Sequence, residues 1–350
     1  MTRTSLNGLV PGKLIGFTKH GLPVFSQAGG APADVDDWIP IEYGSEVVQR
    51  VLAESAVERF GRPVPMSTRT KEIPRSAGLT VTANTTYSDD ASANDSVILK
   101  ARRHIARFSI DEDDLDDANS LVNVIATKSM DWAISYADEF DNSCLGVSAA
   151  ESDTPSNLRP YTSLYKALRT TDSGIGYTAD TNYLTWDDDN LSISASATGA
   201  SAYEKFSALF EKVENGKYWN QAEMLVIAHP SFRSVMRLAM DGNGSPIFKE
   251  SAYIDSATQR PVDTLFTTPI AWSRGARVSA TATDNPTGNP LMFYVNRRYM
   301  ARGDRSGPES QVAAARPQDD TDVTSVKFRV RKGFKLTHPL AASVLERTTN

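Results

Sequence analysis

The stretch that decides the fold is SIDEDDLDDANSLVNVIATKSMDWAISYADEFDNSCLG, residues 109–146. Its apolar side chains recur at spacings that share one helix face: Leu115, Ala118, Val122, Ile125, Trp132, Tyr136 and Phe140. Ser109 and Glu112 match the S-x-x-E capping box, and the aspartates that follow Ser109 suit the positive end of a helix dipole. The pattern predicts one helix from Ser109 to Gly146, roughly 55 Å long.

A short helix and a hairpin are predicted before it. SEVVQRVLAESAVERFG, which opens at Ser45, places apolar residues at helical spacing and ends at Gly61. Residues 62–108 alternate Thr, Val, Ile and Leu around a polar centre, which predicts an elongated β-hairpin. Because polar residues fall on both of its faces, we expect the hairpin to project from the body.

The first 43 residues are rich in Gly and Pro but carry large apolar side chains, among them Phe17, Phe25 and Trp38. This composition favours an extended arm that lies across another surface. A disordered tail is the alternative interpretation.

After residue 146 the patterns alternate between helix and strand. Helices are predicted within YTSLYKALRTT and from Ala200 to Gly216, and a buried strand from Met224 to Ala228 precedes another helix. DTLFTTPIAWS and NPLMFYVNRRYMARGD are strand candidates, with the RGD at 302–304 interpreted as a turn. Near the C-terminus Val326, Phe328 and Val330 alternate with basic residues, as in a half-buried strand. The order indicates a mixed α+β protein.

Composition excludes several classes. The 350 residues carry a net charge of −6, which argues against a protein that coats DNA electrostatically. The single Cys144 excludes an internal disulfide and a cysteine-based zinc site, and the four histidines lack metal-ligand spacing. No signal peptide or membrane-spanning run is apparent, so we expect the protein to work in the compartment where it is made, without a membrane partner.

The acidic run from Asp111 to Asp117 could be interpreted as a two-metal nuclease site. Acidic residues in a first helical turn are what the dipole favours, so we predict no metal, no cofactor and no catalytic residue. The basic runs KARRHIAR (100–107) and RVRKGFK (329–335) lie on predicted strands, where solvated or subunit-bridging charges are expected.

The order of these elements resembles the major capsid proteins of tailed bacteriophages, the Hong Kong 97 fold, across nearly the whole chain. The quoted pieces that carry the resemblance are SEVVQRVLAESAV, PVPM, EIPR, FSIDEDDLDD, DEFDNSCLG, AEMLVIAHPSFRSVMRLAMDGNGSPIF and NPLMFYVNRRYMARGD.

The resemblance implies an α+β capsid fold with four parts. These are an N-terminal arm (1–43), an extended E-loop hairpin (62–108), a peripheral domain with a long spine helix (44–61, 109–146 and 289–350) and a mixed α/β axial domain (147–288). The side chains then expected at subunit interfaces come from the arm, the hairpin and the basic runs: Phe17, Phe25, Trp38, Lys71, Arg75, Asp89, Asp90, Lys100, Arg102, Arg103, Arg329 and Arg331.

The implied function is structural. Copies of the chain would form hexamers and pentamers of an icosahedral head shell, assembled in the host cytoplasm, that encloses double-stranded DNA without sequence-specific binding. The implied partners are other copies, a separate scaffolding protein and a portal, and the sequence leaves open whether decoration proteins bind the shell. Since the sequence enters the arm almost at Met1, we expect no cleaved scaffolding segment, and nothing in the sequence identifies the residues of a covalent cross-link between subunits.

Two rival functions remain. An encapsulin uses the same fold to build a compartment around a cargo enzyme, and the genes beside this one would separate the two. A metal-dependent hydrolase using the run from Asp111 to Asp117 is the more distant rival.

Overall fold

The computed structural model describes most of the chain. The described residues are 13–17, 23–26, 55–76, 95–111, 124–154, 159–187, 202–241, 243–255, 261–313 and 323–348. They divide into two units, Met1–Val47 and Val48–Asn350.

The first unit contains one antiparallel strand pair, β1 (Lys13–Phe17) and β2 (Pro23–Ser26). Phe17 lies opposite Pro23, and Phe25 lies opposite Leu14. Phe17 and Phe25, two of the three apolar candidates of the arm, therefore belong to this pair, whereas Trp38 lies outside the described residues.

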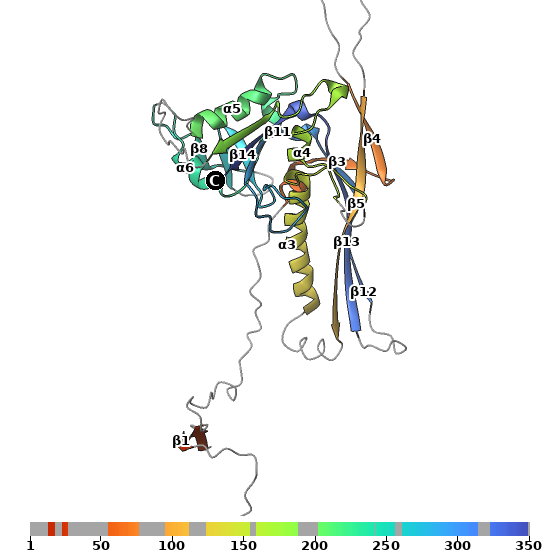
Figure 1. Ribbon diagram of the computed structural model, residues 1–350, viewed down its shortest axis with the longest axis vertical. Helices are drawn as coiled ribbons and strands as arrows, with labels where there is room; N and C mark the ends of the chain where they lie inside the picture. The colour runs from red at the N-terminus through yellow and green to blue at the C-terminus, as the bar shows by residue number, and fades with distance from the viewer. Residues whose placement is uncertain are drawn as a thin grey trace, which may run out of the picture. The chain divides into compact units, whose positions relative to one another are not determined.

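The second unit holds a seven-stranded mixed sheet, in the order β6-β14-β11-β7-β10-β9-β8 (Figure 1). Its strands are β6 (Tyr183–Asp187), β7 (Met224–Ala228), β8 (Phe248–Ile254), β9 (Pro261–Leu265), β10 (Thr268–Trp272), β11 (Leu291–Asn296) and β14 (Ala342–Thr348). The pairs β6–β14 and β7–β10 are parallel and the other neighbours are antiparallel. Thus β11 and β14, from the C-terminal part of the chain, lie in one sheet with strands from 147–288.

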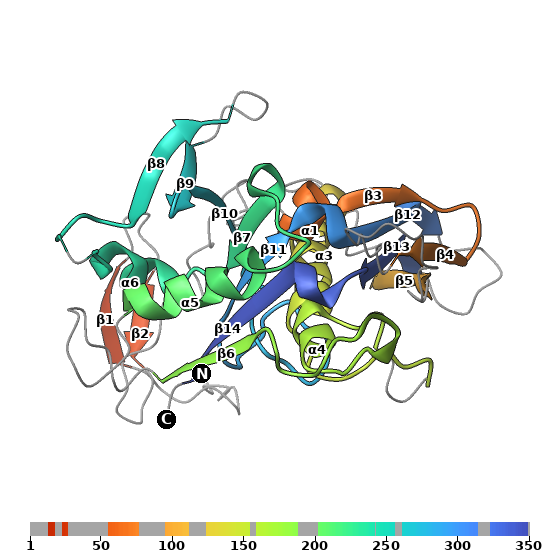
Figure 2. The ribbon, with the colours of Figure 1, turned by 90° about the horizontal axis from the view of Figure 1, so that it is seen from above.

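Helices cover both faces of this sheet, as Figures 1 and 2 show. They are α3 (Val124–Leu145), α4 (Leu164–Leu168), α5 (Ala202–Glu214) and α6 (Phe232–Leu238). Alternate residues of β7 enter two separate cores: Val226 packs in the core with α5 and α6, and Ile227 in the core with α3 and α4. Burial on both faces explains why β7 and β11 are continuous apolar runs.

A second, five-stranded sheet has the order β3-β12-β13-β5-β4. Its strands are β3 (Arg62–Pro65), β4 (Thr70–Arg75), β5 (Asp95–Asp111), β12 (Met300–Ala313) and β13 (Val323–Leu336). The predicted hairpin is present as the antiparallel pair β4–β5, and residues 77–94 between these strands lie outside the described residues.

The prediction that both hairpin faces are solvated is wrong for the described part of β5. Leu99 and Ala101 are buried with Val64 and Met66 in a small core. Beyond Ala101 the burial moves to the other face of the same strand, where Arg102 and His104 are buried. The side chains of β5 still alternate between the two faces of the strand. Up to Ala101 the buried face is the one that packs against Val64 and Met66, and after Ala101 it is the face toward α3.

The long helix predicted from Ser109 begins later in the described part of the chain, at Val124. Ser109 and Asp111 instead end strand β5, opposite Ser325 and Val323 of β13. Ser109 therefore does not cap a helix: its backbone is extended because β5 pairs with β13 from Ala101 to Asp111. Residues 112–123 lie outside the described residues.

The helix face predicted from spacing is confirmed at Tyr136 and Phe140, which are buried, and at Trp132, which packs against the same core. Ile125 is only half-buried, so it does not belong to the core of the single chain. The face that looks uniform in sequence is therefore buried at one end of the helix only.

Other predicted elements agree with the structure or need correction. The strand at 224–228, the helices within 200–216 and 161–171, and the alternation of Val326 to Val330 are confirmed. The short helix α1 (Ala56–Phe60) ends at Gly61 as predicted, and its predicted start at Ser45 lies outside the described residues. The RGD at 302–304 is not a turn: it lies inside β12, paired to β13 and β3.

Candidate functional site

Arg75 anchors the root of the β4–β5 hairpin to the body of the second unit. Its side chain is 9% exposed, and its guanidinium forms ion pairs with Asp95 of β5 and, at 2.7 Å, with Asp172. It also donates to the Thr337 carbonyl at 3.3 Å. Burial alone would lower the pKa of Arg75, but the two carboxylates raise it, so the charge is kept.

Lys100 and Arg102 continue this anchoring along β5. Lys100 Nζ lies 2.7 Å from Glu151 Oε1, and Arg102, which is buried, pairs with Asp153. The hydrogen bond from Arg102 lowers the pKa of the Asp153 carboxyl. Three of the basic side chains predicted for subunit interfaces are therefore compensated inside the chain, by acidic residues of the 151–172 segment.

The other predicted interface residues are distributed differently. Lys71 is exposed and donates to the Pro65 carbonyl at 2.9 Å. Arg103 and Arg329 are exposed and Arg331 is half-buried, all on the distal part of the five-stranded sheet. Asp89 and Asp90 lie outside the described residues.

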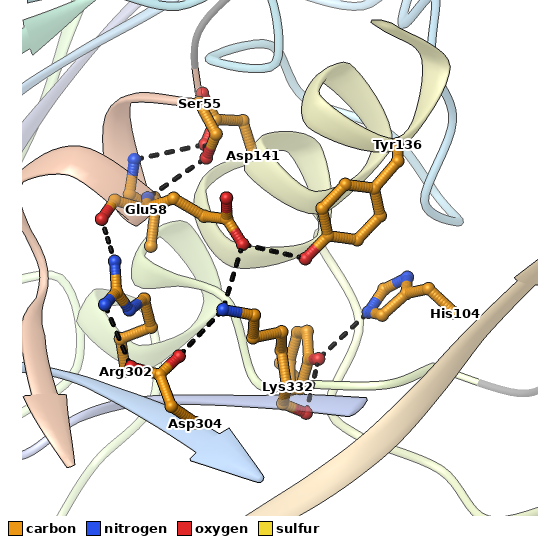
Figure 3. Close-up of polar contacts among 10 residues, drawn as sticks. Ser55, Glu58, His104, Tyr136, Asp141, Arg302, Asp304 and Lys332 are labelled. Atoms are coloured by element: carbon orange, nitrogen blue, oxygen red, sulfur yellow. Dashed lines mark hydrogen bonds and ion pairs between the residues drawn. The ribbon is translucent and has the colours of Figure 1, made fainter. Parts of the chain in front are cut away.

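A polar junction joins α1, α3, β12 and β13 (Figure 3). Lys332 Nζ lies 2.8 Å from Asp304 Oδ1 and 3.3 Å from Glu58 Oε1. The Tyr136 hydroxyl donates to Glu58 Oε1 at 3.0 Å. Arg302 pairs with Asp304 at 2.9 Å and donates to the Glu58 carbonyl. Four elements distant in sequence are thus held by charge-assisted hydrogen bonds, which are stronger than neutral ones.

The charges of this junction stabilise each other. Burial alone would raise the pKa of Asp304, but hydrogen bonds from Lys332 and Arg302 lower it. Beside them the Tyr161 hydroxyl donates to the Lys332 carbonyl at 2.8 Å, so His104 Nε2, at 2.9 Å, is the donor to Tyr161 (Figure 3). The junction therefore extends as one network from α1 to β5.

Asp141 of α3 binds the N-terminus of α1. Its carboxylate accepts from the Ser55 hydroxyl at 2.5 Å, from the Ala56 and Val57 amides at 2.9 and 3.1 Å, and from the Ser273 hydroxyl at 2.6 Å. Ser55 also caps α1 by accepting from the Glu58 amide at 3.1 Å. Burial raises the pKa of Asp141 to about 6, although four donors oppose this shift.

The next residue, Asn142, holds the 275–283 loop. Its amide nitrogen donates to the Gly275 and Arg277 carbonyls, each at 2.9 Å, and its oxygen accepts from Ser279 at 2.6 Å. A Cβ at Gly146 would lie 1.8 Å from the Arg277 oxygen, so only glycine fits where α3 ends. Asp141 and Asn142, near the end of α3, therefore hold both the N-terminus of α1 and the 275–283 loop in place.

The sequence did not point to the junction residues Glu58, Asp304 and Lys332. It also did not point to Asp141, whose hydrogen bonds to Ser55, Ala56, Val57 and Ser273 we call the Asp141 clamp. A partial signal was available: in DEFDNSCLG the polar residues Asp141, Asn142 and Ser143 stand directly between the apolar Phe140 and Cys144, and polar residues in such a run are buried only when they are paired. RGD carried a second signal, because opposite charges two apart on a strand share a face.

The described residues hold no group of three His, Cys, Asp or Glu side chains placed to bind a metal ion. Asp111 ends a strand, and the rest of the acidic run lies outside the described residues. In the part of the chain that the structure describes, no helix is long and apolar enough to span a membrane.

No family model and no curated protein matches the sequence. Solved structures do match. A structure titled Mycobacterium phage Ogopogo has a TM-score of 0.62 at 13% identity, covering 91% of this chain and 100% of that one. The capsid of the cyanophage P-SCSP1u has a TM-score of 0.57 at 14% identity, covering 93% and 98%.

The capsid of the native GTA particle also matches, with a TM-score of 0.58 at 13% identity, covering 89% of this chain and 96% of that one. The likeness spans nearly the full length of each protein, so it concerns the whole architecture rather than one shared motif. The mixed α+β fold of this chain is therefore the fold of phage capsid proteins.

Proposed function

We propose that the protein is a major capsid protein of a tailed phage, which assembles through hexamers and pentamers into an icosahedral head shell around double-stranded DNA. The observation that carries this proposal is the likeness to phage and GTA capsids over 89–93% of the chain. The function is structural, with no catalytic residue and no cofactor.

Surfaces left open by the single chain support the proposal. Met130 on α3 is 52% exposed, and Tyr253 and Ile254 on the edge strand β8 are also exposed. An edge strand with exposed apolar residues invites pairing with another chain. In a shell these surfaces would be covered by neighbouring copies.

Within this proposal the chain parts take the roles of capsid domains. Residues 1–43 form the arm and 62–108 the E-loop, which Arg75 anchors at its root. The peripheral domain comprises α1, α3, β12 and β13. The axial domain comprises 147–288 together with β11 and β14, because these two strands pair with β7 and β6.

The partners proposed are other copies of the chain, a separate scaffolding protein and a portal. The packaged DNA would be enclosed without sequence-specific contacts. We place the mature protein in the virion, after assembly in the host cytoplasm.

Electron microscopy of the full-length protein, expressed alone and with the neighbouring genes of its source genome, tests the proposal. We expect closed shells with pentameric and hexameric units. A protein that stays monomeric under every condition would refute it. Shells that enclose a cargo enzyme, from a gene without portal or terminase neighbours, would replace it by the encapsulin function.

A further inference from the structure

The distal part of the five-stranded sheet carries a surface that we name the basic strip: Arg103, Arg107, Lys327, Arg329 and Arg331. Arg103 lies opposite Arg331 and Arg107 opposite Lys327 in the antiparallel pair β5–β13. Directly opposed residues point to the same face of a sheet, so all five cations share one face.

The other face of this sheet is already covered. Phe328 lies between Trp132 of α3, with ring centroids 5.1 Å apart, and Phe108 of β5, at 6.2 Å. Figure 1 shows α3 running alongside β5 and β13. The basic strip is therefore the face that the described part of the chain leaves open.

Little compensates these charges. Arg329 pairs with Glu309 of β12 at 2.6 Å, and both side chains are about half exposed. Among the described residues, the other four cations of the strip form no ion pair. Ile105 stands between them and is 70% exposed. Arg103, Ile105, Arg107, Lys327 and Arg329 line a cavity of about 790 Å³ at this place.

We infer that the basic strip binds the acidic segment 111–117 of a second copy of this chain. That segment, DEDDLDD, places six carboxylates around one leucine, which matches cations grouped around an exposed isoleucine. Except for Asp111 it lies outside the described residues. The inference rests on the proposed function, since it names one contact between subunits of the shell.

Two observations favour a second copy over other occupants. The segment of the same chain has to lead to Val124 in α3, on the opposite face of the sheet. DNA would also suit cations, but the protein carries a net charge of −6 and the strip has an apolar centre, which a phosphate backbone does not match.

A charge-reversal series on the full-length protein tests the inference, with shell yield measured by sedimentation and electron microscopy. We expect R103E/R107E/K327E to lower the yield about tenfold or more, and high salt to weaken wild-type assembly. The matched control K212E/K217E/R298E reverses three exposed cations elsewhere and should assemble normally. Circular dichroism and thermal unfolding establish that each variant is folded.

The charge swap is the decisive experiment. E112K/D113K/D114K should also assemble poorly, and a chain carrying both triple substitutions should recover a yield within about threefold of wild type. A folded strip variant that assembles normally, or a double variant no better than either triple, would overturn the inference. Normal shells that lose only DNA retention would assign the strip to DNA instead. If wild type forms no shells at all, the proposed function itself fails.

Discussion

The two halves of α3 differ in what covers them. From Ile134 to Leu145 most side chains are buried, and Phe140 is 0% exposed. From Val124 to Ala133 the residues are half-buried or exposed, with Met130 52% exposed. One regular helix thus builds the core of the subunit at one end and presents a surface at the other.

The ion pairs differ in the same way. At the hairpin root Arg75 is 9% exposed and bridges two carboxylates, whereas on the basic strip Arg329 is 52% exposed and has one partner. The comparison teaches that the buried contacts at the hairpin root and at the buried end of α3 determine whether the chain folds. The exposed charges of the basic strip determine what the folded chain can bind.

The largest effect is expected at the buried end of α3. Phe140→Ala should lower the free energy of unfolding by about 3–5 kcal/mol, because it leaves a cavity among Tyr136, Tyr161 and His104. Urea denaturation of the soluble subunit measures it. Met130→Ala, the matched change at the exposed end, should cost less than about 0.5 kcal/mol. Equal losses in the two variants would remove the contrast between the helix halves.

The next effect is expected at the hairpin root. Arg75→Ala should cost about 1–2 kcal/mol, less than a fully buried pair, because Asp172 keeps some contact with water. Arg329→Ala on the basic strip should change stability by less than about 0.5 kcal/mol. Thermal unfolding of both variants compares them, and an Arg329 variant as unstable as the Arg75 variant would contradict the distinction.

A smaller effect depends on pH. The pKa of Asp141 is raised to about 6 from 3.8, so between these values the folded chain holds a proton that the unfolded chain has released. Stability from this group is therefore present at acid pH and falls as pH rises toward 6, by up to about 1.4 kcal/mol per unit.

Comparison with Asp141→Asn isolates this contribution. The pKa of His229 and that of His338 are both lowered to about 4 by burial, and these groups titrate in both proteins and cancel. The stability advantage of wild type over the variant should be larger at pH 5 than at pH 7, as measured by denaturant unfolding. A difference that does not vary with pH would show that Asp141 is ionised throughout.

The smallest effect on folding is expected from removing the arm. Deleting residues 1–43 should leave the unfolding free energy of the second unit within about 0.5 kcal/mol, because the division at Val47 places them in a separate unit. Shell yield, measured by sedimentation, should fall. Loss of helical content in circular dichroism would show that the arm is part of the subunit core.

The spacing of apolar residues in the sequence correctly predicted the buried face of α3 and the buried strand β7. The spacing of Trp132, Tyr136 and Phe140 reflects one helix face that packs against a core, and the apolar run of β7 reflects a strand that is buried on both of its faces. The capping box at Ser109 misled because a local signal competed with β13, which pairs with β5 as far as Asp111. Tertiary pairing overrode the propensity.

The candidate site was less predictable than the fold. Lys100 and Arg102 alternate on a strand like solvated charges, and only the packing of residues 151–153 against β5 brings Glu151 and Asp153 to them. Likewise nothing local indicates that burial on β5 changes faces after Ala101. Both features depend on which distant segment covers which side.

The Asp141 clamp determines where mechanical load enters the body. Ser55 is the first described residue of the second unit, and its contacts with Asp141 lead directly into the buried end of α3. A pulling force applied to the residues before Ser55 would act on the hydrogen bonds between Asp141 and the start of α1 before α1 could separate from α3. We therefore expect the force needed to pull the chain away at Ser55 to depend on Asp141, a carboxylate on another helix.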